Sequence, residues 1–172
     1  QDEDGAVAVR NCTLMNPPSG SPNMVLAQGP NSGSIGTYDL EMRNNVALGT
    51  ARGYKNFSGT TWVISGGGNV AGSVDAFPAA VQAESQTWTS STNTADPSTG
   101  SLVIYDATTG ALLNVAGNDA VGVGVATGAT ATDIAGADRI RGSFADPGAF
   151  TTAKRTITKI IDSTGAGDYI TF

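Results

Sequence analysis

The sequence has no histidine, and this absence excludes the commonest catalytic and metal-binding arrangements. Without an imidazole the chain cannot form a Ser-His-Asp triad or a Cys-His dyad, and acid–base catalysis loses its most frequent residue. A structural zinc site is excluded as well, because the chain offers one cysteine and no histidine. We therefore expect a protein that is not an enzyme and that needs no cofactor.

Cysteine, charge and long apolar runs are also scarce. Cys12 is alone, so no internal disulfide can form; a buried thiol is the simplest interpretation and an intermolecular disulfide the alternative. Charged residues make up 14% of the chain, and the net charge of −6 argues against binding to nucleic acid. No stretch reaches 18 apolar residues, so no transmembrane helix is predicted.

The chain is rich in small residues instead: Ala, Gly, Thr and Ser make up 82 of its 172 residues, whereas Lys occurs three times. It begins with Gln1 rather than Met. We interpret it as the mature form of an exported protein whose leader has been removed. The expected location is therefore extracellular or at a cell surface.

Turn-forming residues recur every 8–12 residues between short alternating runs, which is typical of all-β proteins. We predict one domain, a β-sandwich or jelly roll, with a closed β-barrel as the alternative. It should have about ten short strands and at most one short helix, near residue 79. The expected strands are 6–11, 35–43, 46–54, 60–65, 70–77, 86–89, 102–105, 111–115, 121–125, 140–144, 150–161 and 168–172, with an edge segment at 24–27.

The N-terminal part differs from the rest, because four of the seven prolines lie between residues 16 and 36. Proline lacks an N–H and is confined to loops and sheet edges. We divide the chain into 1–33, an N-terminal strand plus a Pro-rich arm that could be exchanged with a neighbouring subunit, and 34–172, the β-domain.

Two local patterns give sharper expectations. Leu102–Tyr105 and Ala111–Val115 flank Asp106-Ala107-Thr108-Thr109-Gly110 and predict a hairpin. Val and Gly alternate over Val121–Val125, so the glycine face should lie against a backbone or a bulky ring. The tetrapeptide Asn69-Val70-Ala71-Gly72 occurs a second time at 114–117, but the flanking sequences differ, so no true repeat is predicted.

Three kinds of ligand site deserve a test. Trp62, Trp88 and Tyr54 could face a sugar, although core packing is the simpler role for both Trp residues. Asn11 and Asn56 begin acceptor triplets for glycosylation. Calcium is a weaker alternative that would use turn carboxylates, each of which is first a turn residue. These candidates are Asp106, Asp119, Asp133, Asp138 and Asp146.

Low charge, small residues, missing catalytic groups and a strand at each end together favour a structural function. We expect a subunit of an exported filament, pilus-like fibre or surface layer that assembles with copies of itself by β-strand complementation. The candidate assembly residues are Val7, Val9, Ile170 and Phe172. A secreted carbohydrate-binding β-sandwich, with glycans as partners, is the alternative.

The last six residues, 167–172, are similar to the closing strand of chaperone–usher pilins. The cysteine pair of those pilins is missing here, so the similarity implies nothing further about this chain.

Overall fold

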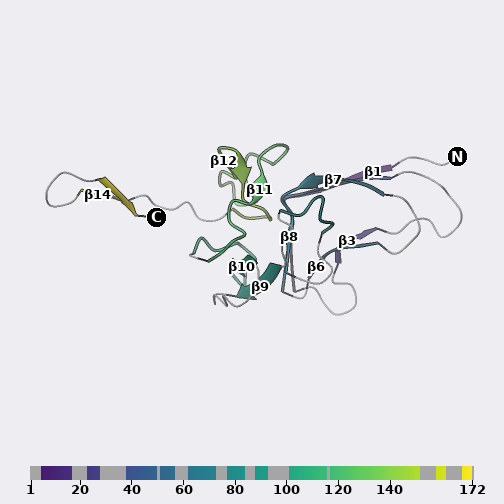
Figure 1. Cartoon of the computed structure of the whole chain (residues 1–172), viewed down its shortest axis with the longest axis horizontal. Helices are drawn as coiled ribbons and strands as arrows, with labels where there is room; N and C mark the ends of the chain where they lie inside the picture. Colours follow the sequence, from purple (N-terminus) through teal and green to yellow (C-terminus); the bar gives the residue numbers. More distant parts are fainter. Residues whose placement is uncertain are drawn as a thin grey trace, which may run out of the picture.

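The computed structural model describes residues 5–16, 23–27, 38–49, 51–56, 62–72, 77–83, 88–92, 101–115, 117–151, 158–161 and 168–171. Within these ranges the chain forms fifteen short strands and no helix, which confirms the all-β class (Figure 1). The strands are β1 (Gly5–Arg10), β2 (Thr13–Met15), β3 (Asn23–Ala27), β4 (Tyr38–Arg43), β5 (Val46–Leu48), β6 (Arg52–Asn56), β7 (Trp62–Gly67), β8 (Val70–Ala71), β9 (Trp88–Thr92), β10 (Ser101–Tyr105), β11 (Gly124–Val125), β12 (Ile140–Arg141), β13 (Phe144–Ala145), β14 (Thr158–Ile161) and β15 (Asp168–Thr171).

The first eight strands stack as successive coils. β1, β4 and β7 form one parallel sheet, and β2, β5 and β8 form a second. Both β1 and β2 pair with strands that lie 33 residues further along the chain, and both β4 and β5 with strands 24 residues further along. A constant offset across two sheets is the signature of a solenoid, in which each turn of the chain lies on the one before it. We call β1–β3 the first coil, β4–β6 the second and β7–β8 the third.

This arrangement does not confirm the predicted sandwich or jelly roll. Those folds are built from antiparallel sheets, whereas the sheets of the stacked coils are parallel. No sheet among the described residues closes into a barrel. Asn44–Asn45, between the predicted strands 35–43 and 46–54, form a corner between two sheets rather than a hairpin turn, because β4 and β5 belong to different sheets.

Inward-facing residues of successive coils stack in register and form the core. Val7, Leu40 and Ile64 make one such column, because β1 pairs with β4 and β4 with β7 at these positions. Val9 and Met42 occupy neighbouring positions of the next column. Leu40 and Met42, in the second coil, are buried on both sides.

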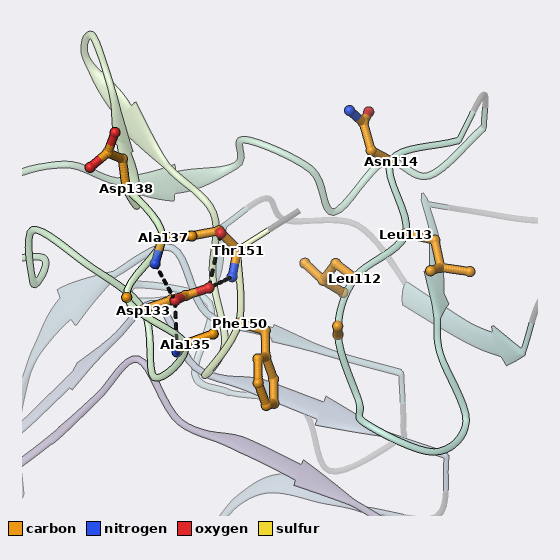
Figure 2. Close-up of a pocket in the computed structure, with 11 residues that line it drawn as sticks. Leu112, Leu113, Asn114, Asp133, Ala135, Ala137, Asp138, Phe150 and Thr151 are labelled. Carbon is orange, nitrogen blue, oxygen red and sulfur yellow. Dashed lines mark hydrogen bonds between the residues drawn. The ribbon is translucent and has the colours of Figure 1, made fainter. Parts of the chain in front are cut away.

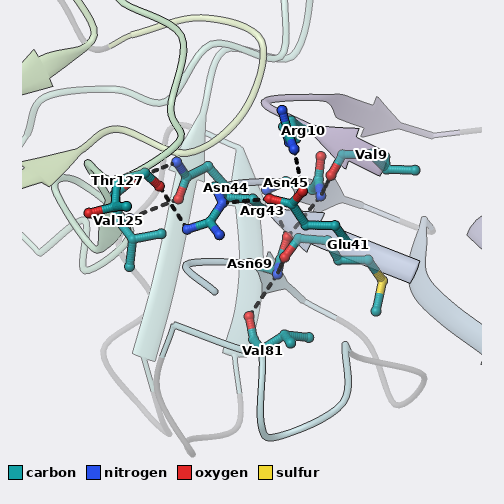
Figure 3. A network of polar contacts seen from close by, with 11 residues as sticks. Val9, Arg10, Glu41, Arg43, Asn44, Asn45, Asn69, Val81, Val125 and Thr127 are labelled. Atoms are coloured by element: carbon teal, nitrogen blue, oxygen red, sulfur yellow. Dashed lines mark hydrogen bonds and ion pairs between the residues drawn. The ribbon is translucent and has the colours of Figure 1, made fainter. Parts of the chain in front are cut away.

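An asparagine ladder joins the coils at their corner. Cys12, Asn45 and Asn69 occupy equivalent positions. The Asn45 side chain accepts a bond from Cys12 N at 3.0 Å and donates to Val9 O at 2.8 Å. Asn69 repeats this one coil further on, accepting from Asn45 N at 3.0 Å and donating to Met42 O at 2.8 Å (Figure 3). Each asparagine thus satisfies backbone groups that the corner leaves unpaired.

The residue before each ladder position adopts a left-handed backbone conformation: φ is 52° at Asn11, 52° at Asn44 and 70° at Gly68. Asn and Gly are the residues that tolerate this conformation best. The Asn44 amide also clamps Val125, accepting from its N and donating to its O, both at 2.8 Å. This clamp joins the coils to the lateral lobe, residues 117–151.

The lateral lobe contains the antiparallel sheet β11–β13–β12. A side chain at Gly122 would meet the Phe144 ring at 3.1 Å, and one at Gly124 would meet Ala145 O at 2.6 Å. The prediction for the Val/Gly alternation is therefore confirmed at both glycines.

Arg139 organises the turns of this lobe from a buried position, with 1% of its surface exposed. Its guanidinium donates to Asp146 O at 2.9 Å, Gly148 O at 2.6 Å and Ala149 O at 3.3 Å. Burial lowers the pKa of Arg139, and the nearby Asp133 and Asp146 carboxylates act in the opposite direction.

The predicted hairpin after β10 is confirmed. Tyr105 bridges to Leu112 in the antiparallel sense, Asp106 N donates to Ala111 O at 2.9 Å, and Gly110 has a φ of 74°. The Asp106 carboxylate accepts bonds from Thr109 N and Thr108 N, which lower the pKa of that carboxyl.

β14 and β15 form an antiparallel hairpin, and they lie within the predicted strands 150–161 and 168–172. Figure 1 places this hairpin at the opposite side of the view from β1 and the N-terminus.

Candidate functional site: the outer edge of the first coil

No strand among the described residues pairs with the outer edge of β1. β1 lies at one end of the sheet β1–β4–β7, and β2 and β3 lie at the ends of their own sheets. The first coil therefore presents backbone N–H and C=O groups that could pair with another strand.

The exposed fractions of inward-facing residues also differ between the first and the second coil. Val7 is 53% exposed, whereas Leu40, directly below it in the column, is 2% exposed. Both side chains occupy inward-facing positions, so the difference arises because nothing in the described structure covers the first coil. An inward-facing apolar residue left half exposed is the kind of surface that a partner covers.

β1 also lacks the features that protect edge strands. Natural edges commonly carry lysine, proline, an inward-pointing charge or a bulge, and these discourage pairing with another chain. The stretch Gly5-Ala6-Val7-Ala8-Val9 has none of these residues and carries no charge. Its pairing with β4 runs without interruption from Gly5 to Arg10. The edge is therefore straight, small and neutral along five residues.

Charge appears only where β1 ends. Arg10 donates a hydrogen bond to Glu41, and Arg43 Nε donates to the other oxygen of the same carboxylate at 2.8 Å (Figure 3). These two guanidinium groups lower the pKa of Glu41. The side chain of Arg10 remains 47% exposed. Just before β1 the sequence reads Gln-Asp-Glu-Asp at residues 1–4. The two ends of this strand thus carry opposite charge.

Two shallow depressions flank Arg10 along the first coil. One, of about 480 Å³, lies on the outward face of β1 and β4 and includes Asp39 and Val63. The other, of about 440 Å³, lies between Cys12 and the lateral lobe at Ile134. Ile134 is 74% exposed. The surface around the open edge is therefore contoured and partly apolar.

A third depression, of about 580 Å³, lies between the hairpin after β10 and the lateral lobe (Figure 2). Asp133 borders it, but its carboxylate is already bonded to Ala135 N, Ala137 N and both Thr151 donors. Burial alone would raise the pKa of Asp133, and these bonds outweigh it and lower the pKa. The arrangement stabilises turns and leaves this carboxylate little capacity for a ligand.

The predicted assembly residues fall on two separate elements. Val7 and Val9 lie in β1, and Ile170 lies in β15, whereas Phe172 is outside the described residues. The structure pairs β1 with β4 and β15 with β14, so it does not bring the two sets together within the chain.

The predicted sugar-facing aromatics lie partly at the core. Trp62 and Tyr54 pack against the cluster that contains Leu40 and Met42. Trp62 also lies 5.2 Å from Tyr38, ring centre to ring centre. Trp88 belongs to β9, but its side chain is outside the described part. A flat aromatic platform is not formed by Trp62 and Tyr54.

The two glycosylation candidates and the cysteine lie near chain corners or strand ends. Asn11 is buried, and its Nδ2 donates to Thr130 Oγ1 at 3.3 Å, so a glycan there would displace this contact. Asn56 ends β6, and its side chain is not described. Cys12 is exposed, so the prediction of a buried thiol is wrong; it lies in the first coil, on which no further strand stacks among the described residues.

The calcium candidates do not gather in one place. No group of three or more Asp, Glu, His or Cys residues that could hold a metal occurs within the described ranges. Several of the predicted carboxylates bind backbone N–H groups instead, as Asp106, Asp119 and Asp133 do.

Sequence reasoning missed Asn45 and Asn69, which hold the coils together, and Arg139, which organises the lateral lobe. A signal for the ladder exists: Asn-Val-Ala occurs at 45–47 as well as at 69–71, and these two copies stack on each other. The copy at 114–116, which looked like the echo of 69–72, lies outside the ladder. Nothing in the local sequence marks Arg139.

The described residues contain no helix with the length and apolarity needed to cross a membrane. The chain matches no protein-family model, no curated protein and no solved structure.

Proposed function

We propose that the protein is a non-catalytic structural subunit that assembles with copies of itself through the outer edge of its first coil. The observation that carries this proposal is the edge of β1, which pairs with no strand in the described ranges and carries no protecting residue, with Val7 half exposed beside it. An edge of this kind pairs readily with another strand by β-augmentation.

The composition supports the same function. The chain has no histidine and few charges, and about half of it is Ala, Gly, Thr and Ser. Stacked coils bury such small residues in register, so they suit a repetitive, close-packed material. The setting we propose is an exported filament, pilus-like fibre or surface layer.

Mass and shape in solution test the proposal. We expect light scattering after size exclusion to show a mass that rises with protein concentration, and electron microscopy to show ordered assemblies. Val7→Lys places a charge on the inward face of the edge and should abolish association. Val63→Lys is the matched control, because Val63 is similarly exposed but faces outward on β7. A strict monomer at all concentrations, or equal behaviour of the two variants, would contradict the proposal.

A further inference from the structure

We propose that the strand that covers the outer edge of β1 is β15 of a second copy, so that the hairpin β14–β15 of each copy adds to the first coil of the next. This inference rests on the proposed function and names its partner strand. The donated strand and the accepting edge are different surfaces of the chain, so the contact is heterologous. It can therefore repeat from copy to copy, as a filament requires.

The hairpin β14–β15 forms a sheet of its own. Its two strands pair with each other and with no other strand among the described residues. Figure 1 draws the hairpin apart from the stacked coils and from the lateral lobe. A two-stranded hairpin alone in water is only marginally stable, whereas three or more strands with an apolar face can be stable. The hairpin therefore gains stability from joining a larger sheet.

The hairpin and the edge of β1 do not meet within one chain. β1 pairs with β4, and Figure 1 shows it at the opposite side of the view from the hairpin. One side of the molecule thus offers strands that lack a sheet, and the other side offers a sheet edge that lacks a strand. This separation suits a contact between successive copies.

The other end of the stacked coils is a poor source of the missing strand, because the chain already covers its corner. Asn69 N donates to Val81 O at 3.2 Å, and Ala83 N donates to Asn69 O at 2.9 Å. Asn69 also forms a parallel bridge with Gln82. The first coil of another copy would have to displace these residues, because its Cys12 would take the place of Gln82 in the ladder. Stacking of coil upon coil between copies is therefore disfavoured.

β15 suits a position inside the extended sheet better than β14 does. The residues Tyr169-Ile170-Thr171 are uncharged and have high β propensity. β14 carries Lys159, which lies opposite Ile170 in the register of the hairpin. Natural sheets place lysine on edge strands, where it discourages further pairing. β14 would thus end the extended sheet, in the order β14–β15–β1–β4–β7.

The open core column places Ile170 of the partner subunit beside Val7. Val7 is half exposed at an inward-facing position and begins the column that continues through Leu40 and Ile64. A large aliphatic residue on the added strand extends this column by one layer and removes Val7 from water.

Cysteine crosslinking between two chains tests the proposed pair. The background is Cys12→Ser, which removes the natural thiol. A Val7→Cys chain mixed with an Ile170→Cys chain should form a covalent heterodimer on mild oxidation, because paired positions of neighbouring strands lie within disulfide reach. A chain that carries both changes should form a ladder of covalent oligomers.

A Tyr169→Cys chain is the matched control for the crosslink. Successive positions of a strand alternate between the two faces of a sheet, so this chain should give about tenfold less heterodimer with Val7→Cys. Equal yields from the two positions would overturn the inference. Crosslinking of Val7→Cys chains only to one another would overturn it as well.

Two isoleucine-to-lysine changes in the hairpin provide an independent test. Ile170→Lys puts a charge into the strand that we place inside the extended sheet, and it should raise the dissociation constant of assembly by about tenfold or more. Ile160→Lys makes the same change in β14, at the new edge, and should raise it by less than about threefold. Equal effects of the two variants would contradict the assignment of β15.

The outcomes separate this inference from the proposed function. A monomer at every concentration defeats both. Association that Val7→Lys abolishes and that Ile170→Lys leaves unchanged keeps the proposed function and defeats the donation of β15.

Discussion

The outer edges of β10 and β1 differ in how their backbone groups are satisfied. Along β10, Asn118 donates to Ile104 O at 2.7 Å and accepts from Ile104 N at 3.1 Å. Asp119 accepts from Leu102 N at 2.8 Å through its carboxylate and donates its own N–H to Leu102 O at 2.9 Å. Along the outer edge of β1, no strand of the described structure pairs with the backbone N–H and C=O groups.

The comparison shows that the chain closes the edge of β10 with its own residues, two polar side chains and the returning arm of the hairpin. Asn118 and Asp119 supply donors and acceptors at the spacing of Leu102 and Ile104, and the returning arm of the hairpin adds Leu113 N, which donates to Ile104 O at 3.0 Å. No strand in the described part of the chain covers β1 in this way, and its apolar column stays open at Val7. This edge of the described structure is the one we assign to assembly.

The largest expected effect concerns the ladder on which the stacked coils depend. Asn69→Ala removes the side-chain partner of Met42 O, Asn45 N and Asn45 Nδ2 in a buried corner. Val81 O also loses its bond from Asn69 Nδ2 and keeps only the bond from Asn69 N at 3.2 Å. We expect a loss of about 4 kcal/mol in the free energy of unfolding, measured by urea titration.

Asn114→Ala is the matched control for this change. Asn114 begins the same Asn-Val-Ala tripeptide but lies outside the ladder. It should cost less than about 1 kcal/mol. Equal losses in the two variants would contradict the structural role of the ladder.

The next effect concerns the lateral lobe, which borders the open edge near Ile134. Arg139→Met removes the donors to Asp146 O, Gly148 O and Ala149 O while keeping an unbranched side chain. We expect a loss of about 3 kcal/mol in urea unfolding, since buried carbonyls lose their partners. Arg43→Met, an arginine at the rim of the same lobe, should cost less than half as much; the reverse order would contradict the assignment.

A smaller loss of stability is expected from a substitution that opens the closed edge of β10. Asn118→Ala removes the bonds to Ile104 and Leu113 and should destabilise the chain by about 2 kcal/mol. It should also create a second site of association, detected as a larger mass by light scattering. If the variant loses stability and gains no tendency to associate, the comparison between the two edges fails.

The smallest expected effect is a dependence of the free energy of unfolding on pH. The pKa values of Glu41 and Asp133 are lowered in the folded chain. Their contribution to stability is therefore present above the ordinary carboxyl pKa of about 4, and it is lost as pH falls through the lowered values. We expect urea unfolding to show a decline of about 1 kcal/mol below pH 4. Asp133→Asn should flatten this decline, and an unchanged profile would contradict the assignment.

Much of the local structure could be predicted from the sequence. Alternation located β1, turn chemistry located the hairpin around Asp106, and the Val/Gly pattern at 121–125 foretold the contacts of Gly122 and Gly124. These features depend on neighbours in the chain, so local residue types determine them.

The stacking of coils could not be predicted in the same way. A corner such as Asn44–Asn45 has the composition of a hairpin turn, and only the pairing of distant strands distinguishes the two. The openness of the β1 edge likewise depends on what the rest of the chain leaves uncovered. Arg139 is buried because carbonyls of residues 146–149 converge on it, which no local pattern indicates.

Hydrogen–deuterium exchange at β1, measured at low and high protein concentration, tests the central claim most directly. We predict that amides of β1 exchange quickly in dilute solution and become protected as the concentration rises, because a second copy then covers the edge. Amides of β10, closed by Asn118 and Asp119, should be protected at both concentrations. Protection of β1 that does not change with concentration would contradict the account.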